Sequence, residues 1–126
     1  VDERPVDLVI AEGMSAWGDP RLLLVVLENL IQNAWKFTAL QPEARIEVGM
    51  ANFAGQKVCF VRDNGVGFNP AHAHRLFQPF QRLHPASEFP GSGIGLATVK
   101  RIIHRHGGRV WIEAKQGVGA TVYFTL

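Results

Sequence analysis

The longest patterned stretch of the chain runs from Asp19 to Thr38, where apolar residues recur every three or four positions. At about 100° per residue, these positions form one arc of about half the circumference of a helix. Asp19 is a favourable N-cap, and Pro20 loses no hydrogen bond at the first helical position. The pattern therefore predicts one long amphipathic helix. Its core-facing residues would be Leu23, Leu24, Val26, Leu27, Leu30, Ile31, Ala34, Trp35 and Phe37.

Strands are predicted on both sides of this helix by period-two alternation of apolar and polar residues. The clearest case is Ile46, Val48 and Met50, which alternate with Glu47 and Gly49. The last two strands are joined by a glycine-containing turn, which is typical of a closing hairpin. The expected strands cover residues 6–12, 15–17, 45–51, 57–62, 109–114 and 120–126.

A second helix is expected to open within residues 91–96 and to run to about His106, where Gly107 and Gly108 would end it. Its apolar arc would comprise Leu96, Val99, Ile102 and Ile103. Residues 69–90 before it contain four prolines and three histidines, with one possible helical turn at 71–76. An irregular segment of this length in a compact domain is usually a lid or a linker.

The composition leaves the predicted elements unchanged, but it argues against several classes of protein. The 126 residues suit one domain, 47% are hydrophobic and 19% are charged. A net charge of +2 and the absence of a long basic run argue against nucleic-acid binding. No signal peptide is visible, and no apolar run approaches the roughly 18 residues of a membrane span. We therefore expect a soluble domain, and the single Cys59 indicates a buried thiol in a reducing compartment.

Glycine clusters occur at residues 65–67, 91–95 and 117–119, each where two predicted elements meet. A glycine pair is most often an ordinary turn, but glycines also let the backbone approach a ligand. The helix start at Gly93 to Leu96 would direct free N–H groups and the positive end of the helix dipole outward, which favours phosphate. Neither a Rossmann fingerprint nor a Walker loop is present.

Polar side chains near these glycines have two interpretations. Asp63 either bonds its own turn or accepts a hydrogen bond from an exocyclic amine at a pocket floor, which would select adenine over guanine. Asn29, Asn33 and Lys36 either form a solvated helix face or line the edge of a cleft.

The histidines do not suggest a metal site. His72 and His74 are expected to be a surface pair, and His106 a packed or capping residue. His84 is either a solvated loop residue or a phosphate contact. None of the five histidines of the chain has the surroundings of a phosphoacceptor.

Five stretches, in order, resemble the motifs of the ATP-binding domain of sensor histidine kinases. This domain has the Bergerat-type ATPase fold, which is shared with gyrase, mismatch-repair and heat-shock chaperone ATPases. The wording of the motifs is most similar to phytochrome-like and PAS-linked hybrid kinases. The stretches are residues 29–38 (asparagine box), 63–68 (first glycine box), 77–80 (phenylalanine box), 91–96 (second glycine box) and 117–121 (last glycine box).

The resemblance implies an α/β two-layer sandwich, with a mixed, mostly antiparallel sheet and helices on one face, formed by a single domain over residues 1–126. It also implies a mobile ATP lid at about residues 69–92. Asn33 would ligate the Mg²⁺ that bridges the ATP phosphates. Lys36, and Arg82 in the lid, would act on the phosphates, and Asn29 would sit beside the metal.

The same resemblance implies the nucleotide contacts. Asp63 would accept a hydrogen bond from the adenine amine, Phe37 would pack near the adenine, and Thr121 would lie at the purine end. The remaining nucleotide-binding residues would be Gly65, Gly67, Phe68, Gly91, Gly93, Gly95 and Leu96.

The implied function is donation of the ATP γ-phosphate to a histidine on a separate dimerisation domain, in a cytoplasmic two-component pathway with a response regulator. That domain's motif, a histidine followed by an acidic residue on a long helix, does not occur in this chain. Two alternatives stay open. One is an ATPase or clamp of the same fold, in which a glutamate one turn before Asn33 would activate water; that position is Asn29, and Glu28 points about 100° away. The other is an ATP-binding module without catalysis.

Overall fold

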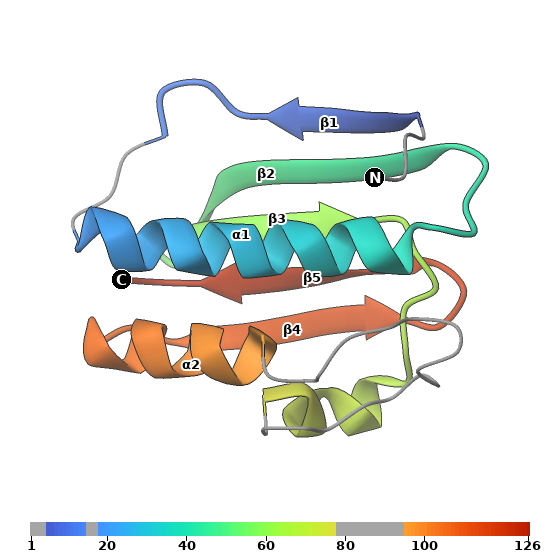
Figure 1. Cartoon of the computed structure of the whole chain (residues 1–126). Helices are drawn as coiled ribbons and strands as arrows, with labels where there is room; N and C mark the ends of the chain where they lie inside the picture. The colour runs from blue at the N-terminus through green and yellow to red at the C-terminus, as the bar shows by residue number, and fades with distance from the viewer. Residues whose placement is uncertain (1–4, 15–17, 78–94) are drawn as a thin grey trace.

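The computed structural model of the chain describes residues 5–14, 18–77 and 95–126, with the side chains of residues 72–74 left out (Figure 1). The strand expected at 15–17 and the segment 78–94 lie outside these residues. The elements are β1 (Val6–Ile10), α1 (Pro20–Phe37), β2 (Ala44–Phe53), β3 (Gln56–Asp63), the 3₁₀ helix η1 (Pro70–Phe77), α2 (Gly95–Arg105), β4 (Val110–Lys115) and β5 (Gly119–Phe124).

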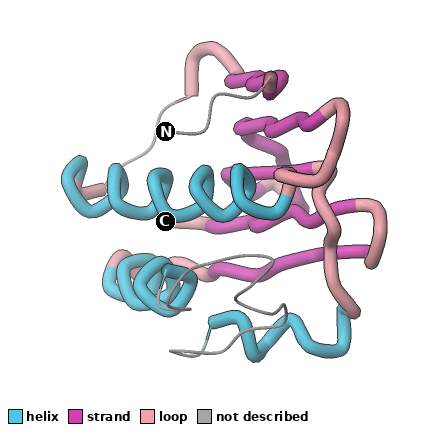
Figure 2. Tube along the Cα trace, turned by 45° about the vertical axis from the view of Figure 1, so that its right-hand side comes forward, coloured by secondary structure: helices cyan, strands magenta, loops and turns pink. Residues whose placement is uncertain are grey.

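The five strands form one sheet in the order β1-β2-β3-β5-β4. β1 pairs with β2 in parallel, and the other neighbours are antiparallel. Figure 2, turned from the view of Figure 1, shows α1 and α2 on the same face of the sheet. The predicted two-layer sandwich with a mixed, mostly antiparallel sheet is therefore confirmed.

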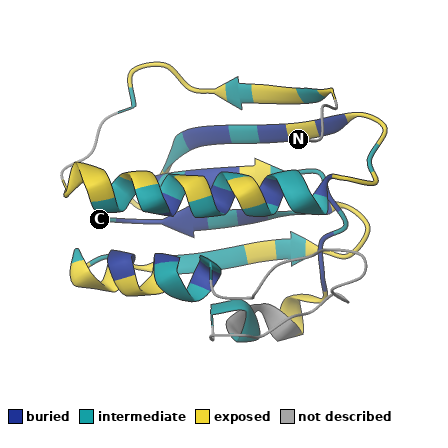
Figure 3. Cartoon of the chain, viewed as in Figure 1, coloured by how far each residue is buried: buried dark blue, intermediate teal, exposed yellow. Residues whose placement is uncertain are grey.

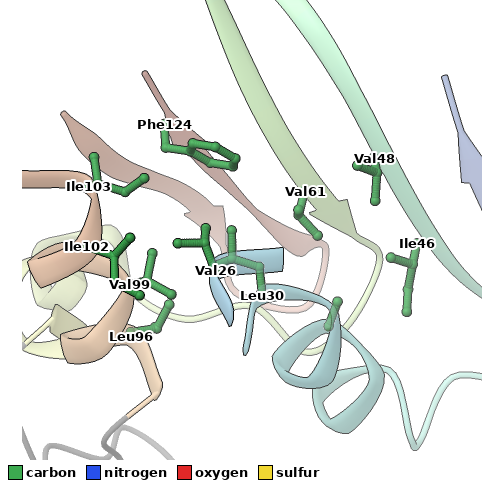
Figure 4. Packing of buried hydrophobic residues seen from close by; sticks show 11 residues of the cluster. Val26, Leu30, Ile46, Val48, Val61, Leu96, Val99, Ile102, Ile103 and Phe124 are labelled. Atoms are coloured by element: carbon green, nitrogen blue, oxygen red, sulfur yellow. The ribbon is translucent and has the colours of Figure 1, made fainter. Parts of the chain in front are cut away.

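The core lies between the two helices and the sheet (Figure 4). Val26 and Leu30 of α1 and Val99 and Ile103 of α2 are at most 2% exposed. They pack against buried residues of the inner sheet face, and Figure 3 shows buried positions of both helices alternating with exposed ones. The inner-face residues are Ile46, Val48, Val61 and Phe124.

One residue of the predicted core arc is exposed. Leu24 was expected to face the core, but 56% of it is accessible. It lies at the border of an arc that spans about half the helix, whereas the buried residues of α1 are only Val26, Leu30 and Ala34. The contact line with the sheet is thus narrower than the apolar arc.

The C-terminal end of the second helix follows the expected glycine signal. Gly107 has a φ of +76°, and the N–H of Gly108 donates to the carbonyl of Ile103 over 3.0 Å. This is the 6→1 bond of a Schellman ending. His106 links the two helices, because its Nε2 accepts a hydrogen bond from the N–H of Asp19 over 3.0 Å. Its Nδ1 donates to the carbonyl of Ile102 in the last turn of α2 over 2.9 Å, so the expected capping role of His106 at the end of α2 is confirmed.

The outer sheet face carries a separate apolar cluster instead of helices. Val58, Phe60 and Tyr123 are at most 7% exposed, and Trp111 stacks on Tyr123 with ring centroids 5.4 Å apart. The Phe60 ring lies over Gly49, where a Cβ would be 2.7 Å from it. Aromatic side chains therefore shield this face themselves.

Candidate functional site

The site begins where β3 ends, at Asp63. Its Oδ1 accepts a hydrogen bond from the N–H of Gly65 over 2.8 Å. Burial raises the pKa of the Asp63 carboxyl from 3.8 to about 6, although hydrogen bonds from the backbone of Gly65 and Ala120 act in the opposite direction. A partly desolvated carboxylate is thus held at the end of a central strand, on the face that α1 covers.

The first glycine loop is pressed against the end of α1. The N–H of Val66 donates to the carbonyl of Phe37 over 3.1 Å. A Cβ on Gly65 would lie 2.3 Å from that same carbonyl oxygen. The glycine at position 65 is therefore required by contact with the chain itself.

The first glycine loop also packs on the turn between β4 and β5. A Cβ on Gly67, whose φ is +61°, would lie 2.2 Å from the carbonyl oxygen of Lys115. The N–H of Gly117 donates to the carbonyl of Val66 over 2.7 Å. A Cβ on Gly119 would lie 2.1 Å from the carbonyl oxygen of Asp63. Two glycine boxes far apart in sequence thus form one close-packed backbone floor around Asp63.

The last two turns of α1 lead from the glycine floor to Asn33. Asn33, Lys36 and Phe37 are all half-buried. The Asn33 carboxamide makes no hydrogen bond with any residue in the described part of the chain. Its oxygen therefore has no hydrogen-bond partner among the described residues.

Asn29, one turn earlier, lies against α2. Its Nδ2 donates to the carbonyl of Val25 over 2.8 Å. The position that a Cβ on Gly95 would take is 2.8 Å from its Oδ1. Asn29 is thus brought to the second glycine box, at the first residue of α2.

Thr121 is not brought together with these residues. It was expected at the purine end, but its Oγ1 accepts a hydrogen bond from Nε of Arg62 over 3.2 Å. Arg62 pairs with Glu47 on the outer sheet face. Because Thr121 pairs with Arg62 and Ala120 pairs with Asp63, successive side chains of β5 point to opposite faces. The residue of β5 beside Asp63 is Ala120.

The remaining predicted residues divide into two groups. Phe68 and Leu96 are 8% and 7% exposed, so their side chains belong to the interior. Arg82, Gly91 and Gly93 lie outside the described residues, as does His84. Of the proposed lid, only its first part is described, as the 3₁₀ helix η1.

Asn64 is a site residue that the sequence interpretation missed. Its Oδ1 accepts a hydrogen bond from the N–H of Arg45, and its Nδ2 donates to the carbonyl of Glu43, each over 2.8 Å. The side chain thereby fastens the loop after Asp63 to the start of β2. The available signal was an Asn directly before a glycine, which is common in turns that bond through side chains.

The donor set suits a hard cation that also binds phosphate. Among the described residues there is no cluster of three or more His, Cys, Asp or Glu side chains able to hold a metal. The Asn33 carboxamide oxygen, without a hydrogen-bond partner in the described part of the chain, is a neutral, hard donor, and Mg²⁺ in nucleotide sites usually takes one or two protein ligands with phosphate and water. The residues present therefore fit Mg²⁺ delivered with a nucleotide.

Residues 18–126 of the chain match the family described as histidine kinase-, DNA gyrase B- and HSP90-like ATPase. The described site residues all lie within this range. The match therefore covers α1, both described glycine loops and α2.

Among curated proteins, the chain is similar to the methanogenesis regulatory histidine kinase FilI of Methanothrix harundinacea, with 43% identity over 98% of the chain. Cyanobacterial phytochrome A of Nostoc is 43% identical over 82% of the chain. The chain spans 14% of the length of each of these relatives.

Solved structures show the same architecture. The mycobacterial sensor histidine kinase MprB superposes with a TM-score of 0.73 and 28% identity, over 94% of this chain and 78% of that one. Full-length ShkA, solved in complex with AMPPNP, gives a TM-score of 0.75 and 26% identity, over 94% of this chain and 24% of that one. No helix in the described residues is long and apolar enough to cross a membrane.

Proposed function

The chain belongs to the histidine kinase-, DNA gyrase B- and HSP90-like ATPase family, and we propose that it binds Mg·ATP and donates the γ-phosphate to a histidine of a separate domain. The observation that carries this proposal is the packing of the glycine floor around Asp63 against the end of α1, the helix that carries Asn33. Asp63 is a hydrogen-bond acceptor held at the end of β3, and the Asn33 side chain is an amide without a hydrogen-bond partner in the described residues.

At the adenine end, Asp63 would accept a hydrogen bond from the exocyclic amine. Backbone hydrogen bonds from Gly65 and Ala120 hold the carboxylate, and the bond from Gly65 to Oδ1 fixes its orientation. Guanine carries a carbonyl where adenine carries this amine, so an ionised Asp63 would face an acceptor and reject it. Phe37, half-buried at the end of α1, would pack near the base.

At the phosphate end, Asn33 would hold Mg²⁺ and Lys36 would meet the phosphates. Bound Mg²⁺ would neutralise charge on the phosphate oxygens. The backbone amides at the start of α2, where Gly95 and Leu96 lie, would add neutral donors and the positive end of the helix dipole. Within the lid, Arg82 would supply a further positive charge at the γ-phosphate.

Phosphoryl transfer would then rely on positioning and charge neutralisation. A nitrogen of the acceptor imidazole would form a bond to the γ-phosphorus while the bond to the β,γ-bridging oxygen breaks and ADP leaves. Hydrolysis is the competing reaction, and it needs a base beside the attacking water. Position 29 carries an amide, and Glu28 on the neighbouring position is exposed, which favours transfer.

The partners belong to the proposal as well. The acceptor histidine would lie on a dimerisation domain of the same parent protein, and a response regulator would take the phosphoryl group onward. We place the domain in the cytoplasm, without a direct contact to membrane or nucleic acid. The relative FilI, of whose length this chain spans 14%, is named as a histidine kinase.

The decisive experiment mixes the chain with its cognate histidine hairpin and γ-labelled ATP. We expect acid-labile, alkali-stable label on the hairpin, and none when its histidine is replaced. Label released only as phosphate would favour the ATPase, and binding with neither product would favour a non-catalytic module.

Nucleotide choice is tested separately by calorimetry with ATP and GTP. We expect ATP to bind at least about tenfold more tightly, because a buried acceptor left facing a carbonyl costs more than about 1.4 kcal/mol. Asp63→Asn should reduce this ratio. Equal affinities in the unaltered chain would refute the adenine assignment.

A further inference from the structure

The two helices of the layer touch through one polar side chain near the proposed phosphate site. α1 and α2 lie side by side (Figure 1). At the start of α2, the Oδ1 of Asn29 occupies the space beside Gly95, so close that a Cβ there would be 2.8 Å away. Any side chain at position 95 would meet the carboxamide or push the helices apart.

The Asn29 carboxamide is also fixed in orientation. Its Nδ2 donates to the carbonyl of Val25 over 2.8 Å, in a partly buried position. This bond directs the amide nitrogen back along α1 and the oxygen toward α2. The side chain of Asn29 is therefore restrained, because rotation of its carboxamide would break the hydrogen bond to the carbonyl of Val25.

We propose that Asn29 is a positioning residue: it sets the gap between α1 and the first turn of α2, and so places that turn for the phosphates without touching the nucleotide itself. The proposal rests on the proposed function, because it assigns the phosphates to the start of α2. It changes the expectation from the sequence, which placed Asn29 beside the metal.

The contrast with Asn33 supports this division. Both residues are asparagines one turn apart on the same helix, but the Asn33 carboxamide has no hydrogen-bond partner among the described residues. Asn29 has its nitrogen bound and its oxygen against Gly95. In the described residues no hydrogen bond restrains the Asn33 carboxamide, whereas the Asn29 carboxamide is bound to its own helix and lies beside Gly95, so Asn33 is the better placed of the two to turn toward a metal. A glutamate at position 29 would place a carboxylate against the carbonyl of Val25 and lose this bond.

The far end of the same helix pair has an independent anchor. There, the N–H of Asp19 at the start of α1 donates to His106, just after the end of α2. Loss of this anchor would loosen the helices far from Gly95. His106→Ala is therefore a control for a general loss of packing between the helices.

The first test compares ATP with adenosine, which lacks the phosphates. For Asn29→Ala we expect the affinity for ATP to fall about tenfold and the affinity for adenosine to change by less than about twofold. A tenfold effect is of the size found for coupled neighbouring groups. The ATP loss should be the same in Mg²⁺ and in EDTA. For Asn33→Ala, in contrast, the loss should appear only with Mg²⁺.

Controls are Gln32→Ala, an exposed position on α1, and His106→Ala. Both should leave the ratio of ATP to adenosine affinity unchanged, and His106→Ala should lower only the melting temperature. A loss for Asn29→Ala that appears only with Mg²⁺ would overturn the proposal, since it would make Asn29 a metal ligand. An unchanged ATP affinity would also overturn it.

The second test is a double-mutant cycle with Gly95→Ala. The new methyl group should weaken ATP binding in the unaltered background, because it meets Oδ1 of Asn29. In the Asn29→Ala background the methyl group has space, so the double variant should bind ATP no more weakly than Asn29→Ala alone. Additive losses would contradict the positioning role. If Gly95→Ala does not fold, which circular dichroism would show, the comparison in Mg²⁺ and EDTA still decides.

These outcomes are separable from failure of the proposed function. If the unaltered chain does not bind ATP, the proposed function is wrong. If it binds ATP and the Asn29 variants behave like Gln32→Ala, only the positioning role is wrong.

Discussion

At the scale of single residues, the burial of the Asp63 carboxyl has a cost in stability, and we propose that the same carboxyl binds adenine. Its carboxyl has a pKa of about 6 in the folded chain and 3.8 as the ordinary value, because burial disfavours the charge. The folded state therefore holds the proton more tightly than the unfolded chain. The associated stability is complete below pH 3.8 and is lost as the pH rises through 6.

We predict that Asp63→Asn stabilises the nucleotide-free chain at pH 8 by about 1 to 3 kcal/mol, since each pKa unit is worth about 1.4 kcal/mol. The amide oxygen keeps the bond from Gly65, so the loop is preserved. The gain should shrink below pH 6 and vanish below pH 4. Thermal unfolding of both proteins between pH 4 and 8 measures it, and a gain that does not depend on pH would show that ionisation is not its cause.

At the scale of elements, the glycine floor depends on backbone contacts that leave no space for a side chain. Gly67→Ala would place a methyl group 2.2 Å from the carbonyl oxygen of Lys115, at a φ of +61°. We predict that Gly67→Ala lowers the free energy of unfolding by at least about 3 kcal/mol, because it adds backbone strain and forces the β4–β5 turn to shift.

The matched control for this prediction is Gly55→Ala in the β2–β3 turn. Gly55 also has a positive φ, of +83°, but nothing lies within 4 Å of the added methyl group. We expect Gly55→Ala to lower the free energy of unfolding by only about 1 kcal/mol, because only the left-handed backbone conformation disfavours the alanine. Urea unfolding of both variants gives the two values. Equal losses would mean that the contact with Lys115 is relieved at no cost.

At the scale of the whole molecule, the proposed binding site lies on the inner face of the sheet, and the aromatic cluster on the outer face contributes to stability only. The inner face meets the helices and the site, whereas the outer face carries Tyr123 at 6% exposure and Phe53 at 47%. We predict that Tyr123→Ala lowers the free energy of unfolding by about 3 kcal/mol and leaves ATP affinity unchanged below the melting temperature.

The control on the outer face is Phe53→Ala. Its ring contacts both Trp111 and Tyr123 edge-on, but about half of it is already in water, so we expect a loss of about 1 kcal/mol. Unfolding and calorimetry on the same samples test both residues. A clear drop in ATP affinity for Tyr123→Ala would show that the faces are coupled through β5.

Much of the architecture follows from local signals. The apolar period of α1, the N-cap at Asp19, the glycine stop at Gly107 and the alternation in β2 are properties of short stretches of backbone, and each appears in the structure as predicted. The order of the motif boxes likewise identified the family, because motifs can be recognised along the sequence without knowing which elements contact one another in the fold.

The remaining features depend on which residues meet across the fold. The register of β3 with β5 turns Thr121 to the outer face and sets Ala120 beside Asp63. The line along which α1 meets the sheet leaves Leu24 exposed, and the approach of α2 brings Gly95 against the carboxamide of Asn29. Burial, and with it the pKa of Asp63, also comes from distant segments. Local periodicity predicts the elements, whereas the contacts that set orientation, desolvation and spacing exist only once the elements have packed.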